Sequence, residues 1–175
     1  MNLLIGCGRT RDKRLMRQSQ PEWDNLVTLD IEACHKPDIL WDLESPEPIP
    51  LPDCHFDEIH AYHVLEHTGR QGDWRFFFRQ WADFYRLLKP ASVFFGICPD
   101  IKSPWAWGDP GHTRIIGPEC LTFLDQSQYE KQVGKSSMTD YRSVFQGDFD
   151  VLLSESDGSE FRFAIQAIKP SRVHV

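Results

Sequence analysis

Short apolar runs alternate with helical patterns along the chain. Runs of this kind that are bounded by turn residues are typical of buried strands. Two runs near the end, FDVLLSES (149–156) and EFRFAIQAI (160–168), flank Asp157 and Gly158 and predict a hairpin. The other predicted strands are residues 2–5, 25–29, 38–40, 57–62 and 92–98.

One segment has the spacing of an amphipathic helix. Asp73 is a good N-cap, and Pro90 marks the end of the pattern. The apolar positions between them recur every three or four residues, which predicts one buried face. They are Trp74, Phe77, Phe78, Trp81, Phe84, Tyr85 and Leu88. A second, weaker helix is predicted over residues 118–133.

This order of elements predicts an α/β fold. Strands that alternate with helices favour a doubly wound, mostly parallel, Rossmann-like sheet, and the hairpin adds an antiparallel strand at the C-terminal end. The length of 175 residues suits a single domain over residues 1–175. The Pro-dense stretch SPEPIPLPD (45–53) is interpreted as an extended connection.

Composition narrows the compartment and the partners. The chain has no apolar run long enough for a membrane span and no signal peptide at its start, so we expect a cytoplasmic protein. The five cysteines include no CxxC pair, which favours reduced thiols. A net charge of −7 disfavours a nucleic-acid partner. The basic run RTRDKRLMR (9–17) is interpreted as a solvated helix face.

Glycine and polar residues follow the predicted strands. In open α/β sheets, ligands bind beyond the carboxyl ends of the strands. The first five strands are followed in turn by GCG (6–8), Asp30, Asp42, HVLEH (63–67) and Pro99 with Asp100. Any one of these features is common, but together they predict a ligand site at one edge of the sheet.

These residue types suit a nucleoside that carries an amino acid. Gly6 and Gly8 allow the backbone to approach a ligand closely. Asp30 stands where dinucleotide-type folds place the carboxylate that binds ribose hydroxyls. Asp42 can accept from an exocyclic amine, and the Leu43 N–H can donate to a ring nitrogen. The absence of a third glycine weakens a nicotinamide interpretation.

The chain resembles the class I S-adenosylmethionine-dependent methyltransferases, and most closely their small bacterial and phage type. NLLIGCG (2–8), LVTLDIE (26–32), residues 38–67, YRLLKPAS (85–92) and ICPD (97–100) carry the resemblance, in that order. It implies S-adenosylmethionine as the cofactor, bound by Gly6, Cys7, Gly8, Asp30, Ile31, Asp42, Leu43, His63, Val64 and Leu65. The chain departs from the family pattern at Leu4, Thr10 and KPAS (89–92).

HVLEH has a second interpretation. On a helix, HxxEH is a zinc-binding pattern of peptidases, which would make the protein a zinc hydrolase. However, DEIHAY (57–62) predicts a strand directly before it, and Gly69 and Gly72 follow closely. We therefore expect no metal at HVLEH and place His63 and Glu66 beside the cofactor; in the alternative interpretation they only hydrogen-bond to loop backbone. His60, inside the strand, is expected to be a core histidine.

The segment PDIKSPWAWGDPGHTR (99–114) follows the fifth predicted strand, where a methyl acceptor would bind. The candidate catalytic residues are His112, Asp109 and Asp100, with His112 as the base because imidazole titrates near neutral pH. The candidate substrate-binding residues are Trp105, Trp107 and Arg114. In the alternative interpretations, this loop only packs over the sheet edge, or the protein is a noncatalytic module on the methyltransferase fold. No motif identifies the acceptor or an oligomeric state.

Overall fold

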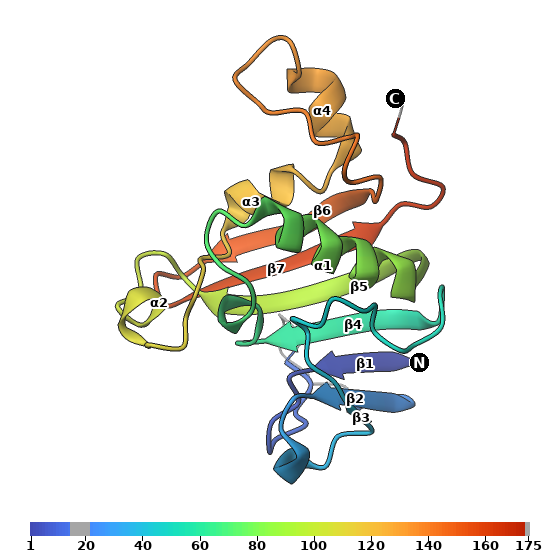
Figure 1. Ribbon diagram of the computed structural model, residues 1–175, viewed down its shortest axis with the longest axis vertical. Helices are drawn as coiled ribbons and strands as arrows, with labels where there is room; N and C mark the ends of the chain where they lie inside the picture. The colour runs from blue at the N-terminus through green and yellow to red at the C-terminus, as the bar shows by residue number, and fades with distance from the viewer. Residues whose placement is uncertain (15–21, 174–175) are drawn as a thin grey trace.

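The computed structural model describes residues 1–14 and 22–173, and a seven-stranded sheet in the order β3-β2-β1-β4-β5-β7-β6 runs through it (Figure 1). β1, β2, β3, β4 and β5 pair in parallel, whereas β7 is antiparallel to both β5 and β6. The strands are β1 (Asn2–Ile5), β2 (Leu26–Asp30), β3 (Ile39–Leu40), β4 (Phe56–Tyr62), β5 (Leu88–Pro99), β6 (Phe149–Ser156) and β7 (Glu160–Ala167). The predicted mostly parallel sheet with a C-terminal antiparallel hairpin is confirmed.

The long helix α1 (Trp74–Leu87) connects β4 to β5 and lies across one face of the sheet (Figure 1). It begins as predicted, because Asp73 Oδ1 accepts a hydrogen bond of 3.0 Å from Phe76 N. β5 begins at once at Leu88, so the strand predicted from residue 92 starts too late. Among the described residues, no helix is both long and apolar enough to cross a membrane.

Aromatic side chains fill the layer between α1 and the sheet. Trp81 of α1 is 1% exposed. Its ring lies against Phe94 of β5, Phe149 of β6 and Phe163 of β7, at centroid distances of 5.0, 6.0 and 6.2 Å. Rings of this size bury large apolar areas, so the layer stabilises the C-terminal half of the sheet.

Lys13 and Trp23, from the described parts of the connection between β1 and β2, lie against side chains of β4. Trp23 lies edge-on against His60, and Lys13 Nζ is 2.7 Å from Glu58 Oε2. His60 is fully buried and hydrogen-bonded through both ring nitrogens, which confirms it as a core histidine. Its hydrogen bond to Glu58, together with Lys13, lowers the pKa of Glu58 to about 2 although burial opposes this. The helix predicted over residues 9–17 is absent from 9–14, and residues 15–17 lie outside the described part.

The helix predicted over residues 118–133 is divided into α3 (Pro118–Thr122) and α4 (Gln126–Gln132). Leu124 O accepts a hydrogen bond from Phe149 N of β6, so it is not available to continue a helix. Asp125 then caps α4 by accepting from Ser127 N at 2.8 Å. The remaining short elements are η1 (Ala33–His35), η2 (Leu65–His67) and α2 (Trp105–Gly108).

Candidate active site

A pocket of about 190 Å³ opens at the carboxyl ends of β1, β2, β3 and β4. This is the edge at which the sequence predicts a ligand. The predicted cofactor residues that line the pocket are Gly6, Asp30, Ile31, Asp42, Leu43 and Val64. Five further residues line the pocket without having been predicted from the sequence pattern: Leu29, Trp41, Glu44, His67 and Thr68. Cys7 and Leu65 are instead buried in the core, at 3% and 0% exposure.

The glycine loop after β1 packs tightly against the turn after β4. Gly6 has a φ of +62°, and a Cβ at this position would come within 2.6 Å of Val64 Cγ2. Gly6 N donates to Leu29 O at 2.8 Å, which ties the loop to β2. A residue other than glycine would both strain the backbone and push the loop away from Val64.

The Asp30 side chain connects the loops after β1 and β2 by hydrogen bonds. Its Oδ2 accepts a hydrogen bond of 2.8 Å from Gly8 N, and its Oδ1 accepts one of 2.8 Å from Glu32 N. His35 Nδ1 lies 3.2 Å from Oδ2. Burial opposes ionisation of Asp30, but the hydrogen bonds from Glu32, Gly8 and His35 lower its pKa on balance. The carboxylate is therefore held charged, and it keeps unused lone pairs for a ligand.

The loop after β3 forms the other wall of the pocket. Asp42 is exposed, and its Oδ1 accepts a hydrogen bond of 2.8 Å from Glu44 N. Glu44 Oε1 accepts a hydrogen bond of 2.6 Å from Gly69 N, which joins this loop to the turn after β4. Ile31 is 60% exposed and lies at the pocket between Asp30 and this wall. Glu44 also lines the pocket. Its position two residues after Asp42 is the only sequence signal for this.

HVLEH is a turn and not an α-helix, as its sequence neighbours predict. β4 ends at Tyr62, His63 adopts a left-handed φ of +54°, and the single turn η2 follows. A histidine in this conformation is uncommon and often marks a functional site. His63 lies between Glu66 Oε1 at 3.4 Å and Glu160 Oε1 at 3.0 Å. Glu66, and to a lesser extent Glu160, raise the pKa of His63 although burial opposes this.

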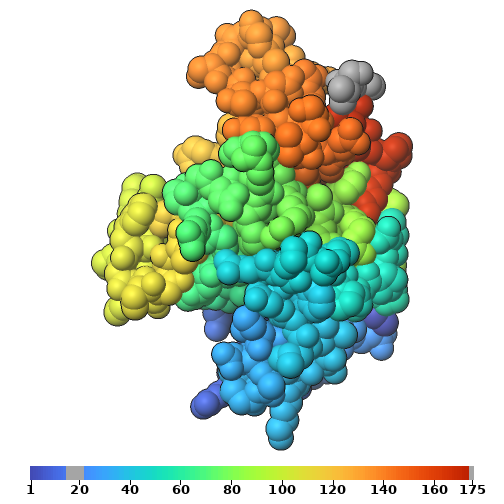
Figure 2. All heavy atoms as spheres, in the orientation of Figure 1, coloured from blue at the N-terminus to red at the C-terminus, as the bar shows by residue number. Residues whose placement is uncertain are grey.

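The predicted acceptor loop presents two exposed tryptophans. Trp105 and Trp107, on α2, are 69% and 68% exposed. The segment around them, coloured yellow in Figure 2, projects from the side of the molecule. Neither ring packs the loop over the sheet, so a purely packing role does not account for them.

Two other predicted residues of this loop, the substrate-binding candidate Arg114 and the catalytic candidate Asp100, are buried and hydrogen-bonded within the protein. Arg114 is 6% exposed and donates to Leu65 O, Thr68 Oγ1 and Gln80 Oε1. Burial lowers the pKa of Arg114 to about 10. Asp100 is 3% exposed, and its Oδ1 accepts a hydrogen bond of 2.7 Å from Lys102 N. The side chain of Arg114 thus holds the turn after β4, and that of Asp100 closes the turn after β5.

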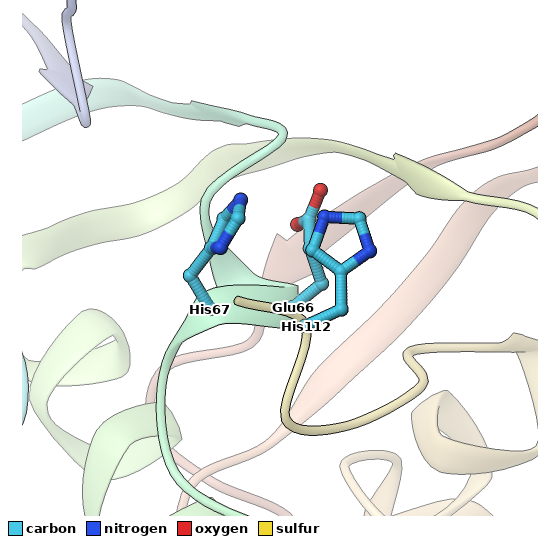
Figure 3. A group of neighbouring side chains, drawn as sticks. All are labelled: Glu66, His67 and His112. Carbon is cyan, nitrogen blue, oxygen red and sulfur yellow. The ribbon is translucent and has the colours of Figure 1, made fainter. Parts of the chain in front are cut away.

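The end of the acceptor loop lies against HVLEH. Thr113 N donates to Glu66 O at 2.9 Å, and His67 Nδ1 is 3.1 Å from Gly111 O. The rings of His67 and His112 are in edge contact, with centroids 4.6 Å apart. Figure 3 shows Glu66, His67 and His112 facing a common space. The proximity of His112 to Glu66 and His67 has no counterpart in the sequence pattern.

No protein-family model and no curated protein sequence matches the chain, whereas many solved structures share its fold. A SAM dependent methyltransferase from Archaeoglobus fulgidus is similar with a TM-score of 0.52 at 16% identity, over 94% of this chain and 85% of that one. The N-methyltransferase NodS from Bradyrhizobium japonicum WM9, in complex with S-adenosyl-l-homocysteine, has a TM-score of 0.54 at 14% identity, over 95% of this chain and 76% of that one. The chain thus has the Rossmann-like fold of class I methyltransferases.

Proposed function

We propose that the protein is an S-adenosylmethionine-dependent methyltransferase. The observation that carries this proposal is the pocket at the carboxyl edge of the sheet, where Gly6, Asp30 and Asp42 converge as the sequence predicts. Solved structures of the same fold include S-adenosylmethionine-dependent enzymes, which supports the same cofactor here.

The residues of the pocket suit this cofactor. Because Gly6 has no Cβ, Val64 packs directly against its backbone, and both residues line the pocket. Asp30 is proposed to accept from the ribose hydroxyls, and Asp42 with the backbone of Leu43 to bind the adenine. Ile31 and Val64 supply apolar contacts, as is typical of ligand pockets. Bound S-adenosylmethionine supplies an electrophilic methyl group on a sulfonium.

The chain itself contributes mainly positioning and exclusion of water. The glycine loop and the HVLEH turn are fixed to each other and to β2, so the pocket is formed before a ligand binds. The acceptor is proposed to enter beside α2, where Trp105 and Trp107 offer apolar surfaces. His112 is proposed to act at the acceptor end, with Asp109 Oδ2 3.8 Å from its Nε2.

Replacing Asp30 with alanine tests the cofactor site. We expect this variant to bind S-adenosylhomocysteine more weakly by about 1 to 3 kcal/mol, because the ribose hydroxyls and two backbone N–H groups lose their acceptor. Isothermal titration calorimetry measures the change, and the exposed Asp24→Ala serves as the control. Unchanged affinity in Asp30→Ala would place the ribose elsewhere.

Replacing His112 with alanine tests the acceptor end separately. We expect slower methyl transfer and unchanged S-adenosylhomocysteine affinity, because His112 does not line the cofactor pocket. Candidate acceptors with hydroxyl, amine or carboxylate groups can be screened by release of S-adenosylhomocysteine. A normal rate for His112→Ala with an accepted substrate would leave the loop with a structural role only. Cofactor binding without turnover of any acceptor would favour the noncatalytic module.

A further inference from the structure

We propose that Glu66, His67 and His112 form a binding site for a divalent transition-metal ion at the end of the cofactor pocket. One ligand atom from each of the three side chains lies within 4.8 Å of the other two. In Figure 3 the three side chains come from two segments, η2 and the loop that carries His112. Two imidazoles and one carboxylate are a common ligand set of catalytic zinc and related ions.

The buried Glu66 carboxylate has only His63 as an ionic partner in the described part of the chain. The side chain is 3% exposed, and neither of its oxygens accepts a hydrogen bond from a described residue. His63 Nδ1 lies 3.4 Å from Oε1, and the nearby Arg114 donates its hydrogen bonds to other residues. A buried ionised carboxylate is costly unless it is paired or coordinates a metal. A cation held by Glu66 would bind the carboxylate oxygens that accept no hydrogen bond from the described residues.

His67 is oriented as a metal ligand would be. Its Nδ1 is 3.1 Å from Gly111 O, so a proton on Nδ1 is donated to that carbonyl and Nε2 keeps a free lone pair. Metal-binding histidines usually hold their second ring nitrogen in this way. A Cβ on Gly111 would come within 3.2 Å of His67 Nδ1, so glycine allows the close approach.

His112 is the ligand from the distant loop. Its Nδ1 is buried and has no hydrogen-bond partner among the residues that the structure describes, while its Nε2 lies 3.8 Å from Asp109 Oδ2. Hydrogen bonds from Gly111 N to Asp109 Oδ1 and from Thr113 N to Glu66 O fix the loop on both sides of the ring. The imidazole is therefore held beside Glu66 and His67 with unused capacity to bind a cation.

The ligand atoms would have to move only slightly closer together to bind a small ion. Metal bonds of about 2.1 Å to tetrahedral ligands place the ligand atoms about 3.4 Å apart. Separations of up to 4.8 Å exceed this distance by at most about 1.4 Å, and the exposed side chain of His67 can make most of this movement. Imidazole ligands favour zinc or cobalt over magnesium and calcium, which prefer oxygen.

Three protein ligands leave a coordination position open, as in catalytic sites. His67 also lines the cofactor pocket, so the cation would lie where the two regions meet. If the proposed methyl transfer is correct, this open position favours an acceptor that offers an oxygen ligand. His112 would then act on the acceptor through the cation. The sequence predicts no metal at HVLEH because the segment is not on a long helix. A metal site that takes one ligand from residues 99–114 does not need such a helix.

Metal binding can be tested without an acceptor. The full chain, stripped with a chelator, is titrated calorimetrically with Zn²⁺, Co²⁺, Mn²⁺ or Mg²⁺ alone, and Co²⁺ binding is also followed by visible absorption. We expect one transition ion per chain, with affinity about tenfold or more weaker in Glu66→Gln and in His67→Ala. The control His55→Ala removes an imidazole that lies just before the start of β4, at the opposite end of the strand from the cluster, and this variant should bind as the wild type does. Saturable binding of Mg²⁺ alone, or of no ion, would overturn the proposal, as would unchanged affinity in both ligand variants.

Melting temperatures of the variants without metal distinguish the loss of a metal-binding side chain from the loss of the fold. Glu66→Gln removes a buried charge at nearly constant volume, so its melting temperature without metal should equal or exceed that of the wild type. If this variant does not fold, His67→Ala decides the question, because its side chain is exposed. Titration of the wild type with S-adenosylhomocysteine tests the proposed cofactor binding separately. The failure of one proposal can therefore be distinguished from the failure of the other.

Discussion

Gly6→Ala is expected to weaken S-adenosylhomocysteine binding by about a hundredfold or more. The left-handed φ of +62° costs an alanine about 1 to 2 kcal/mol. The new Cβ would also lie 2.6 Å from Val64 Cγ2 and 2.9 Å from Val64 Cβ, so the loop must move away from the HVLEH turn. This movement would strain the hydrogen bond from Gly6 N to Leu29 O and shift Gly6 relative to Val64, and both residues line the pocket. Each 1.4 kcal/mol corresponds to a tenfold change in affinity.

Two other glycines provide controls for the Gly6 experiment. Gly158 has a φ of +85° with open space around it, so Gly158→Ala introduces similar strain in the hairpin turn between β6 and β7 and should bind normally. Gly8 has a φ of +56° with no atom near its missing Cβ, so Gly8→Ala should show an intermediate loss. Calorimetry gives the affinities and circular dichroism the melting temperatures. Wild-type affinity in Gly6→Ala would show that the ligand does not lie against this loop.

Trp81→Ala is expected to reduce the free energy of unfolding by about 3 to 5 kcal/mol. Trp81 is 1% exposed and contacts rings from three strands, so its removal leaves a cavity that those strands cannot fill together. Its Nε1 is buried and forms no hydrogen bond with any described residue. Trp81→Phe should therefore lose less, because it removes this unsatisfied donor while keeping most of the ring.

Urea denaturation measures the effect on stability. The exposed Trp107→Ala is the matched control and should change the free energy of unfolding by no more than about 0.5 kcal/mol. A loss below about 1 kcal/mol in Trp81→Ala would mean that the aromatic layer between α1 and the sheet can collapse into the space. In that case the other buried side chains of α1 would be sufficient to hold the helix on the sheet.

Local pattern alone was sufficient for the elements that depend on local physics. The apolar spacing after Asp73 predicted α1, because a helix brings residues three and four apart onto one face. Asp157 and Gly158 predicted the turn of the C-terminal hairpin. The rule that parallel strands place their carboxyl ends at one edge was enough to predict that Gly6, Asp30 and Asp42 meet in a pocket.

Contacts between distant segments could not be predicted in this way. Leu124 looks helical in sequence, but its carbonyl pairs with Phe149 of β6, and this tertiary hydrogen bond divides the predicted helix. Arg114 resembles a substrate-binding residue, but it is buried against Thr68 and Gln80. The cost of leaving buried polar groups unpaired decides such cases, and it depends on neighbours that sequence spacing does not reveal.

The HVLEH segment shows where the two kinds of information divide. Its sequence determined that it follows a strand and forms a turn, because DEIHAY favours a strand and the nearby glycines do not support a long helix. The tertiary structure alone decided that His112 lies beside Glu66 and His67, because hydrogen bonds between Glu66 and Thr113 and between His67 and Gly111 hold the two loops together. A turn depends on adjacent residues, whereas a cluster of ligands depends on how the whole chain packs.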